Sequence, residues 1–321
     1  MSELYSTDLI TQAARRHFVG ADLSATQYAV DRAAPILPVT EPAGIVSVLD
    51  PRSFVNSTGD TNTSEGGIRT PTAKVQRLDL SFSSVAYQCK PWAFETPVSA
   101  EGTTVPAPAK HMSAALTLKR ELWAYKEALF ASKAFASSVQ SVSATAAWNT
   151  SSAKIVKDIR AAAAKIGKVG AVANALIISR PVLDIMMQSD EILNRFSGVV
   201  IATYDLVVQN AAALFGLKYV IVSDAVKATT RAPKTLDTAH IVPTDQALVA
   251  VVPDDPADET APAFARTFVV SDYDQDGNAV PNVEYSVYYE PQTRSFVHQA
   301  AMTLDVVIGA PHLACRITGV Q

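Results

Sequence analysis

The chain has 321 residues, of which 48% are hydrophobic and 18% are charged, and its formal net charge at pH 7 is −4. This composition supplies a core and excludes global disorder, and the length corresponds to two domains or to one domain with extensions. The lack of a basic excess argues against tight nucleic-acid binding. No secretory signal or bilayer-spanning window is recognisable, so we expect a chain that stays in the cytoplasm or assembles there.

Residues 1–70 contain one predicted helix, at residues 7–18, whose basic end (Arg15, Arg16 and His17) suits the helix dipole better than it suits DNA contact. Four prolines and a polar stretch at residues 56–67 follow. So long a loop-like segment is improbable inside a compact domain. We therefore expect an extended arm that lies on neighbouring subunits.

Residues 71–110 predict a β-hairpin, because apolar side chains alternate with polar ones at residues 78–82 and again at residues 85–89. Trp92 and Phe94 add aromatic surface after it. An isolated hairpin is marginal in water, so these aromatic side chains are predicted to pack on another subunit. The alternative is that the hairpin folds back on its own core.

A long helix is predicted at residues 111–135, where Leu118, Leu122, Tyr125 and Leu129 recur on one face. Its length corresponds to a rod of about 37 Å. Lys119, Arg120 and Glu121 (residues 119–121) are expected on other parts of its surface.

An α/β layer domain is predicted from residue 149 onwards, since helical and buried-strand patterns alternate. The helices are expected at residues 149–166, 181–187, 189–196 and 204–215, and the strands at 174–179 and 218–223. Strand-like segments then follow at residues 247–252, 267–270, 283–289, 294–308 and 313–317.

Catalytic and metal-binding motifs are scarce in this sequence. The histidines have no metal-ligand spacing, Cys89 and Cys315 are predicted to be free thiols, and neither a nucleophile elbow nor a P-loop is present. Asp272, Asp274 and Asp276 match the opening of a calcium loop. Because Val283 occupies the position of its bidentate glutamate, we favour a hairpin turn and keep the three aspartates as a weak metal-site candidate.

The order of several segments resembles the major capsid proteins of tailed double-stranded DNA bacteriophages, which have the Hong Kong 97-type fold. The matching segments are YQCKPWAFETPVSAE (87–101), the long helix, TAAWNTSSAKIVKDIRAAAAKI (145–166), ANALIISRPVLDIMMQSDEILNRF (173–196), LFGLKYVIVSDAV (214–226) and YYEPQTRSFVHQAAMTLDVVIGAPHLACRI (288–317). Together they cover most of residues 75–317. Asn174 departs from the family pattern because it follows Ala173 where Pro-Asn is common.

The resemblance implies an α+β capsid fold and a division into functional segments. These are an N-terminal arm (1–70), a projecting E-loop (71–110), a peripheral domain with the spine helix (111–165), an axial domain (166–282), peripheral strands with a loop (283–310) and a C-terminal axial strand (311–321). Trp92 and Phe94 would contact the adjacent subunit, and Glu290 and Arg294 would pair between subunits.

The function implied is that of a structural protein without catalysis or cofactor, which assembles in the host cytoplasm into hexamers and pentamers of an icosahedral virion capsid. Its partners would be further copies of itself, a portal, a scaffolding protein, in some phages a decoration protein, and double-stranded DNA contacted weakly and non-specifically, with no membrane. The alternatives are an encapsulin-type compartment on the same fold and, in another class, an α/β enzyme or ligand-binding protein.

Overall fold

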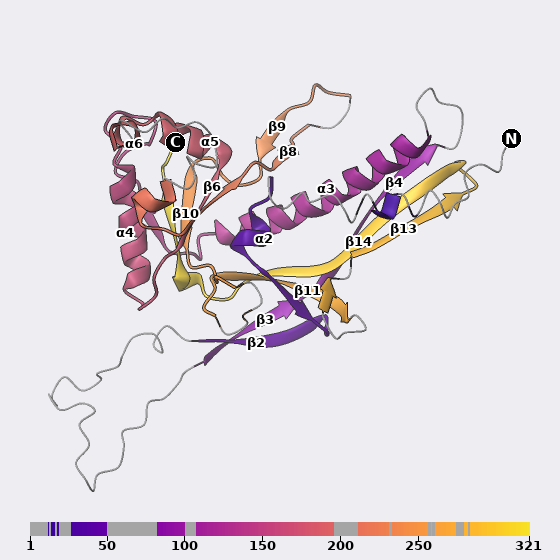
Figure 1. Cartoon of the computed structure of the whole chain (residues 1–321), viewed down its shortest axis with the longest axis horizontal. Coiled ribbons are helices and arrows are strands. Elements are labelled where there is room, and N and C mark those ends of the chain that lie inside the picture. Colours follow the sequence, from indigo (N-terminus) through magenta and orange to yellow (C-terminus); the bar gives the residue numbers. More distant parts are fainter. Residues whose placement is uncertain are drawn as a thin grey trace, which may run out of the picture.

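Two β-sheets and one long helix organise the chain in a computed structural model (Figure 1). The structure describes residues 12, 14–16, 18, 27–49, 82–99, 107–195, 211–230, 233–255, 258, 261–273, 279–281 and 283–321. The helices are α2 (Val30–Ala33), α3 (Ala107–Ala134), α4 (Ile155–Gly167), α5 (Arg180–Gln188), α6 (Asp190–Arg195) and the 3-10 helix η2 (Pro311–Leu313).

The strands are β1 (Ile36–Val39), β2 (Ala43–Leu49), β3 (Phe82–Gln88), β4 (Lys90–Ser99), β5 (Ser141–Ser143), β6 (Ala175–Ser179), β7 (Tyr219–Ser223), β8 (Val226–Ala228), β9 (Thr238–His240), β10 (Gln246–Ala250), β11 (Ala265–Tyr273), β12 (Ala279–Pro281), β13 (Val283–Glu290), β14 (Ser295–Ile308) and β15 (Ala314–Thr318). The α+β class predicted from the sequence is confirmed.

The larger sheet has six strands and is built around β14. β13 pairs with one edge of β14, while β4 and then β11 pair with the other, and β1 lies parallel to β11. α3 runs along β14 and β4 and packs against them (Figure 1). The long helix predicted from its apolar period is therefore confirmed, and it begins a turn earlier than expected.

A five-stranded sheet in the order β5-β15-β10-β6-β7 forms a second unit, and the C-terminus lies there (Figure 1). β6 is buried at every position and lies between β7 and β10, which is typical of a strand covered on both faces. α4 packs against β15, β10 and β5, and α5 packs against β6 and β7. The predicted α/β alternation is confirmed here.

The N-terminal third differs from prediction. Residues 27–34 lie in the core, where Ala29, Val30 and Ala34 are fully buried, and β1 extends the larger sheet. β1 escaped recognition because it has four residues and contains Pro38, which a strand tolerates at the edge of a sheet. The prediction that residues 1–70 are an arm outside the body is thus wrong for residues 27–39.

The predicted hairpin between residues 78–82 and 85–89 is also wrong, because residues 82–88 form one continuous strand. β3 pairs instead with β2, from Ala43 opposite Gln88 to Leu49 opposite Phe82, so the two-stranded ribbon begins inside the segment predicted as an arm. Residues 90–99 belong to the larger sheet. Two further elements lie in a different unit from the one predicted. α4, most of which the predicted boundaries place in the peripheral segment 111–165, packs on the five-stranded sheet, and β11, which they place in the axial segment 166–282, lies in the six-stranded sheet.

Candidate functional site

The side of α3 that faces the N-terminal segment carries buried charged groups. Lys126 forms an ion pair with Asp31 of α2, and Nε1 of Trp123 donates a hydrogen bond of 3.0 Å to the same carboxylate. Lys126 is 1% exposed and its partner 17%. These contacts fix α2 to the middle of the long helix.

Glu127 holds the start of α2. Its carboxylate accepts hydrogen bonds from the backbone N–H groups of Ala29, at 3.2 Å, and Val30, at 2.8 Å, which are among those that a helix start leaves without an intrahelical acceptor. Burial raises the pKa of Glu127, and the two N–H groups oppose that rise because they favour the carboxylate form. The ammonium of Lys119 donates to the carbonyl of Phe18 at 2.7 Å. Lys119 is thus buried, which corrects the surface position expected from the sequence.

Three hydrogen-bonded side chains join the N-terminal part of α3 to the larger sheet. Tyr285 Oη lies 2.5 Å from Nδ1 of His298, and Nε2 of His298 lies 2.7 Å from Nδ1 of His111. Burial lowers the pKa of His298 to about 4 and also lowers the pKa of His111, while burial raises the pKa of Tyr285. Both histidines are therefore neutral at pH 7, and the tyrosine hydroxyl is protonated.

Trp92 and Phe94, predicted to contact another subunit, lie half-buried on β4 against the helix of their own chain. Their ring centroids are 4.1 Å and 6.3 Å from that of Tyr125 on α3. The chain itself therefore covers part of both rings, as in the alternative that the segment folds back on its own core. Contact of their remaining surface with a second copy stays a prediction.

Glu290 and Arg294 lie at the two ends of the turn between β13 and β14. Thr293 donates its hydroxyl to the Glu290 carboxylate at 2.5 Å, and Arg294 has the positive φ of 46° that closes the turn. Their pairing between subunits stays a prediction. Asp274 and Asp276 lie outside the described residues, as does the side chain of Asp272, so the weak metal-site candidate stays a prediction.

Large apolar side chains are exposed on several projecting elements. Ile45 of the β2–β3 ribbon is 72% exposed and Leu236, in the loop between β8 and β9, is 71% exposed. The others are Val172, Leu193, Val226, Tyr288 and Tyr289. Exposed apolar residues at projecting sites suit contacts with another protein.

The ribbon exposes one face only. Its other face packs Val46, Val85 and Tyr87 onto a small core around Phe268, where the rings of Tyr87 and Phe268 stack at 4.6 Å. Ile45 lies opposite Ala86 on the outer face. The ribbon is thus fixed at its base and offers an apolar side chain outward.

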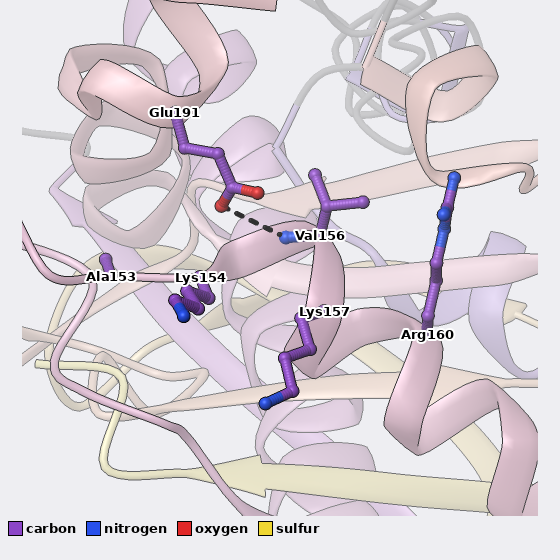
Figure 2. A pocket seen from close by; sticks show the side chains of 6 residues that line it. All are labelled: Ala153, Lys154, Val156, Lys157, Arg160 and Glu191. Carbon is purple, nitrogen blue, oxygen red and sulfur yellow. Dashed lines mark hydrogen bonds between the residues drawn. The ribbon is translucent and has the colours of Figure 1, made fainter.

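A shallow pocket of about 490 Å³ lies beside the start of α4, and Figure 2 shows the side chains that line it. Lys154, Lys157 and Arg160 contribute its positive charge, and Glu191 of α6 accepts a hydrogen bond of 3.4 Å from the backbone N–H of Val156. The residues that line this pocket are charged or apolar, and they include no serine, threonine or cysteine that could act as a nucleophile.

Within the described ranges, no three histidine, cysteine or acidic side chains gather as a metal site. Both cysteines are buried free thiols, as predicted. Burial raises the pKa of Cys89 to about 11, so this thiol is protonated at neutral pH. None of the described helices meets the length and apolarity needed to cross a membrane.

The polar anchors of the N-terminal segment were missed by sequence reasoning. Lys126, Glu127 and Asp31 are ordinary surface residues by type, and their partners lie more than 90 residues away along the chain. The one local signal is that Lys126 and Glu127 lie next to Tyr125 of the apolar face of the predicted helix.

Known proteins of similar fold are found among solved structures. No protein-family model matches the sequence, and no curated protein is similar to it in sequence. Among solved structures, the chain is similar to a phage-related protein from Bordetella bronchiseptica, with a TM-score of 0.68 and 17% identity over 98% of this chain and 97% of that one. It is also similar to the capsid of the cyanophage P-SCSP1u (TM-score 0.53, 12% identity, coverage 93% and 90%) and to the SrpI encapsulin of Synechococcus elongatus (TM-score 0.53, 9% identity, coverage 94% and 90%).

The chain therefore has the Hong Kong 97-type capsid fold, as the resemblance implied. At these identities the similarity establishes the fold and not the function.

Proposed function

We propose that this chain is the major capsid protein of a tailed double-stranded DNA bacteriophage. In this role it assembles with copies of itself, as hexamers and pentamers, into an icosahedral head that encloses the genome. The observation that carries the proposal is the extent of the fold similarity, which spans 98% of this chain and 97% of the phage-related protein. A portal, a scaffolding protein and a decoration protein are further partners in this proposal, and assembly takes place in the host cytoplasm.

The surface properties support a structural role. The pocket beside α4 is lined by charged side chains without a serine, threonine or cysteine nucleophile, whereas large apolar side chains are exposed on the β2–β3 ribbon and beside β9. In an assembled shell such side chains would be covered by a second copy.

An encapsulin-type compartment is the second candidate, because the chain is as similar to the SrpI encapsulin as to the cyanophage capsid, with a TM-score of 0.53 in both comparisons. The two functions differ in what the shell encloses. A phage head protects DNA, whereas a compartment of the second kind encloses protein.

Electron microscopy of the protein purified with its natural assembly partners, followed by nuclease treatment, separates these functions. Icosahedral shells with protected DNA support the capsid proposal. Shells that enclose one protein species support the compartment. A monomer or small oligomer in the presence of the partners contradicts both and directs attention back to the pockets.

Substitution of Ile45 by Ala tests the assembly surface directly. Loss of a buried apolar contact worth about 1.4 kcal/mol raises the protein concentration needed for assembly about tenfold. Ser47→Ala is the matched control, because Ser47 is exposed two residues along the same strand. Equal assembly thresholds for the two variants, measured by light scattering, would remove Ile45 from the proposed interface.

A further inference from the structure

The outward face of α4 carries charge of one sign. Lys154, immediately before the helix, and Lys157, Arg160 and Lys168 are exposed. Asp158, the acidic residue of this helix, points inward and is 2% exposed; its carboxylate accepts hydrogen bonds from Trp148 and from Thr145. The opposite face of the helix is apolar and packs on the five-stranded sheet.

Among the residues that the structure describes, the four exposed cations have no ion-pair partner. No carboxylate of the chain forms a salt bridge within 4.0 Å of Lys154, Lys157, Arg160 or Lys168 in the part that the structure describes. Glu191 is the acidic residue that lines the same pocket (Figure 2). A chain of net charge −4 thus concentrates unpaired positive charge on one helix.

The length and chemistry of this face fit a polyanion. From Lys154 to Lys168 the helix rises about 21 Å. The same length of duplex DNA carries about 12 phosphates on its two strands. Lys and Arg side chains bind phosphate oxygens through charge-assisted hydrogen bonds.

A protein interface fits this face less well, since interface cores depend on large apolar and aromatic side chains. None of the exposed large apolar residues of the described surface lies on α4 itself, although Val172 follows the helix and Leu193 lies on α6; Ala161 and Ala164 are the apolar residues that α4 exposes.

We propose that the outward face of α4 binds the phosphate backbone of double-stranded DNA without sequence preference. The proposal rests on the function proposed above, in which double-stranded DNA is the enclosed molecule. Individual contacts of this kind are weak, and a shell repeats them once per subunit, so the enclosed DNA is held collectively and can still slide.

The test compares two triple variants of the full-length protein that have the same net charge. Lys154→Gln, Lys157→Gln and Arg160→Gln remove the proposed contacts, whereas Lys90→Gln, Lys227→Gln and Lys234→Gln remove three exposed cations on other elements. Binding of a fluorescent 30-base-pair duplex is measured by anisotropy between 50 and 200 mM salt. Duplex binding is measured on the unassembled protein, and shell assembly is measured on separate aliquots of the same preparations by light scattering and electron microscopy.

Each phosphate contact contributes about 0.9 to the slope of log affinity against log salt concentration, so loss of three contacts lowers the slope by between about 2 and 3. Between 50 and 200 mM salt, the fold-decrease in affinity should therefore be about 40 times smaller for the α4 variant than for the unaltered protein. The control should keep the original slope.

Equal slopes for the two variants, or no change in either, would overturn the proposal. So would an α4 variant that binds DNA normally and fails to assemble, because α4 would then contact another copy. These results leave the capsid function standing if the unaltered protein still forms shells around DNA. Failure of the unaltered protein to form shells contradicts that function separately, since duplex binding is measured on the unassembled protein.

Discussion

His298 occupies the centre of a buried hydrogen-bond chain with Tyr285 and His111. Each ring nitrogen of His298 has a partner: Nδ1 lies 2.5 Å from the Tyr285 hydroxyl, and Nε2 lies 2.7 Å from Nδ1 of His111. A proton added to His298 would place a positive charge among buried groups, which is the cause of its lowered pKa. The ring of Phe296 closes over His111 at 5.4 Å, and Lys110 repels additional positive charge there.

We expect stability to fall in mild acid because of His298. Its pKa in the folded state is about 4, below the ordinary value of 6.5, so the unfolded chain binds more protons between these values. Stability is therefore fully present above pH 6.5 and is lost as pH falls towards 4, by about 2 kcal/mol at pH 5. Urea unfolding of the unassembled protein at pH 7 and pH 5 measures the difference.

His298→Gln should lose most of this pH dependence, and His240→Gln should retain it because His240 lies outside the hydrogen-bond chain. Parallel pH profiles for both variants and the unaltered protein would assign the acid sensitivity to other groups.

Gly44 shows how one missing Cβ shapes the ribbon. A Cβ at this position would lie 2.6 Å from the hydroxyl oxygen of Tyr87, and the Tyr87 ring is held by stacking on Phe268. We expect Gly44→Ala to destabilise the protein by about 1–3 kcal/mol through overpacking. Gly167→Ala is the control, since its Cβ would meet nothing within 4 Å and alanine is favoured in a helix. Equal urea midpoints for the two variants would show that Tyr87 moves aside at little cost.

At the scale of elements, α3 is a helix buried on two sides. One side packs on β14 and β4, and the other receives α2 through Asp31, Lys126 and Glu127. Lys133 at its C-terminal end adds an ion pair of 2.8 Å to Asp305 of β14. The helix thus ties the N-terminal segment to the larger sheet.

The ion pair between α2 and α3 gives an element-scale prediction. Lys126→Met leaves the largely buried Asp31 carboxylate without its ion-pair partner and with the hydrogen bond from Trp123, and we expect a loss of about 3 kcal/mol. Adding Asp31→Leu removes the unpaired charge and should restore most of the stability. A double-mutant cycle by urea unfolding measures this coupling, and additive losses would show that the pair is replaceable by solvent.

At the scale of the whole molecule, residues 27–39 are part of the unit formed by α3 and the larger sheet. Residues 27–39 bury Tyr28, Ala29 and Val30 and add β1 to the larger sheet. Deletion of residues 1–70 is therefore expected to unfold the protein, and not only to prevent assembly. Near-UV circular dichroism compared with the full-length chain is the measurement. A native spectrum combined with failed assembly would instead restore the interpretation of this segment as a separable arm.

The capsid architecture was predictable because its longest elements carry local signals. The apolar period of α3, the unbroken apolar run of β6 and Gly167 at the C-terminal end of α4 each identify an element from neighbouring residues. The order of these elements carried the resemblance to capsid proteins. The predicted intersubunit residues Trp92 and Phe94 were recognised as important aromatic side chains, and their contact with Tyr125 required the fold.

The sequence by itself determined the class of the fold, its principal helices and buried strands, and the absence of the catalytic motifs that were sought. Only the tertiary structure decided which strands pair, because β2 and β3 meet across more than 30 intervening residues and β1 contains a proline. It also decided that Lys126, Glu127 and His298 lie in the core. A polar group can be buried when a distant part of the chain supplies its hydrogen-bond partner, and the local periodicity of a sequence does not identify that partner.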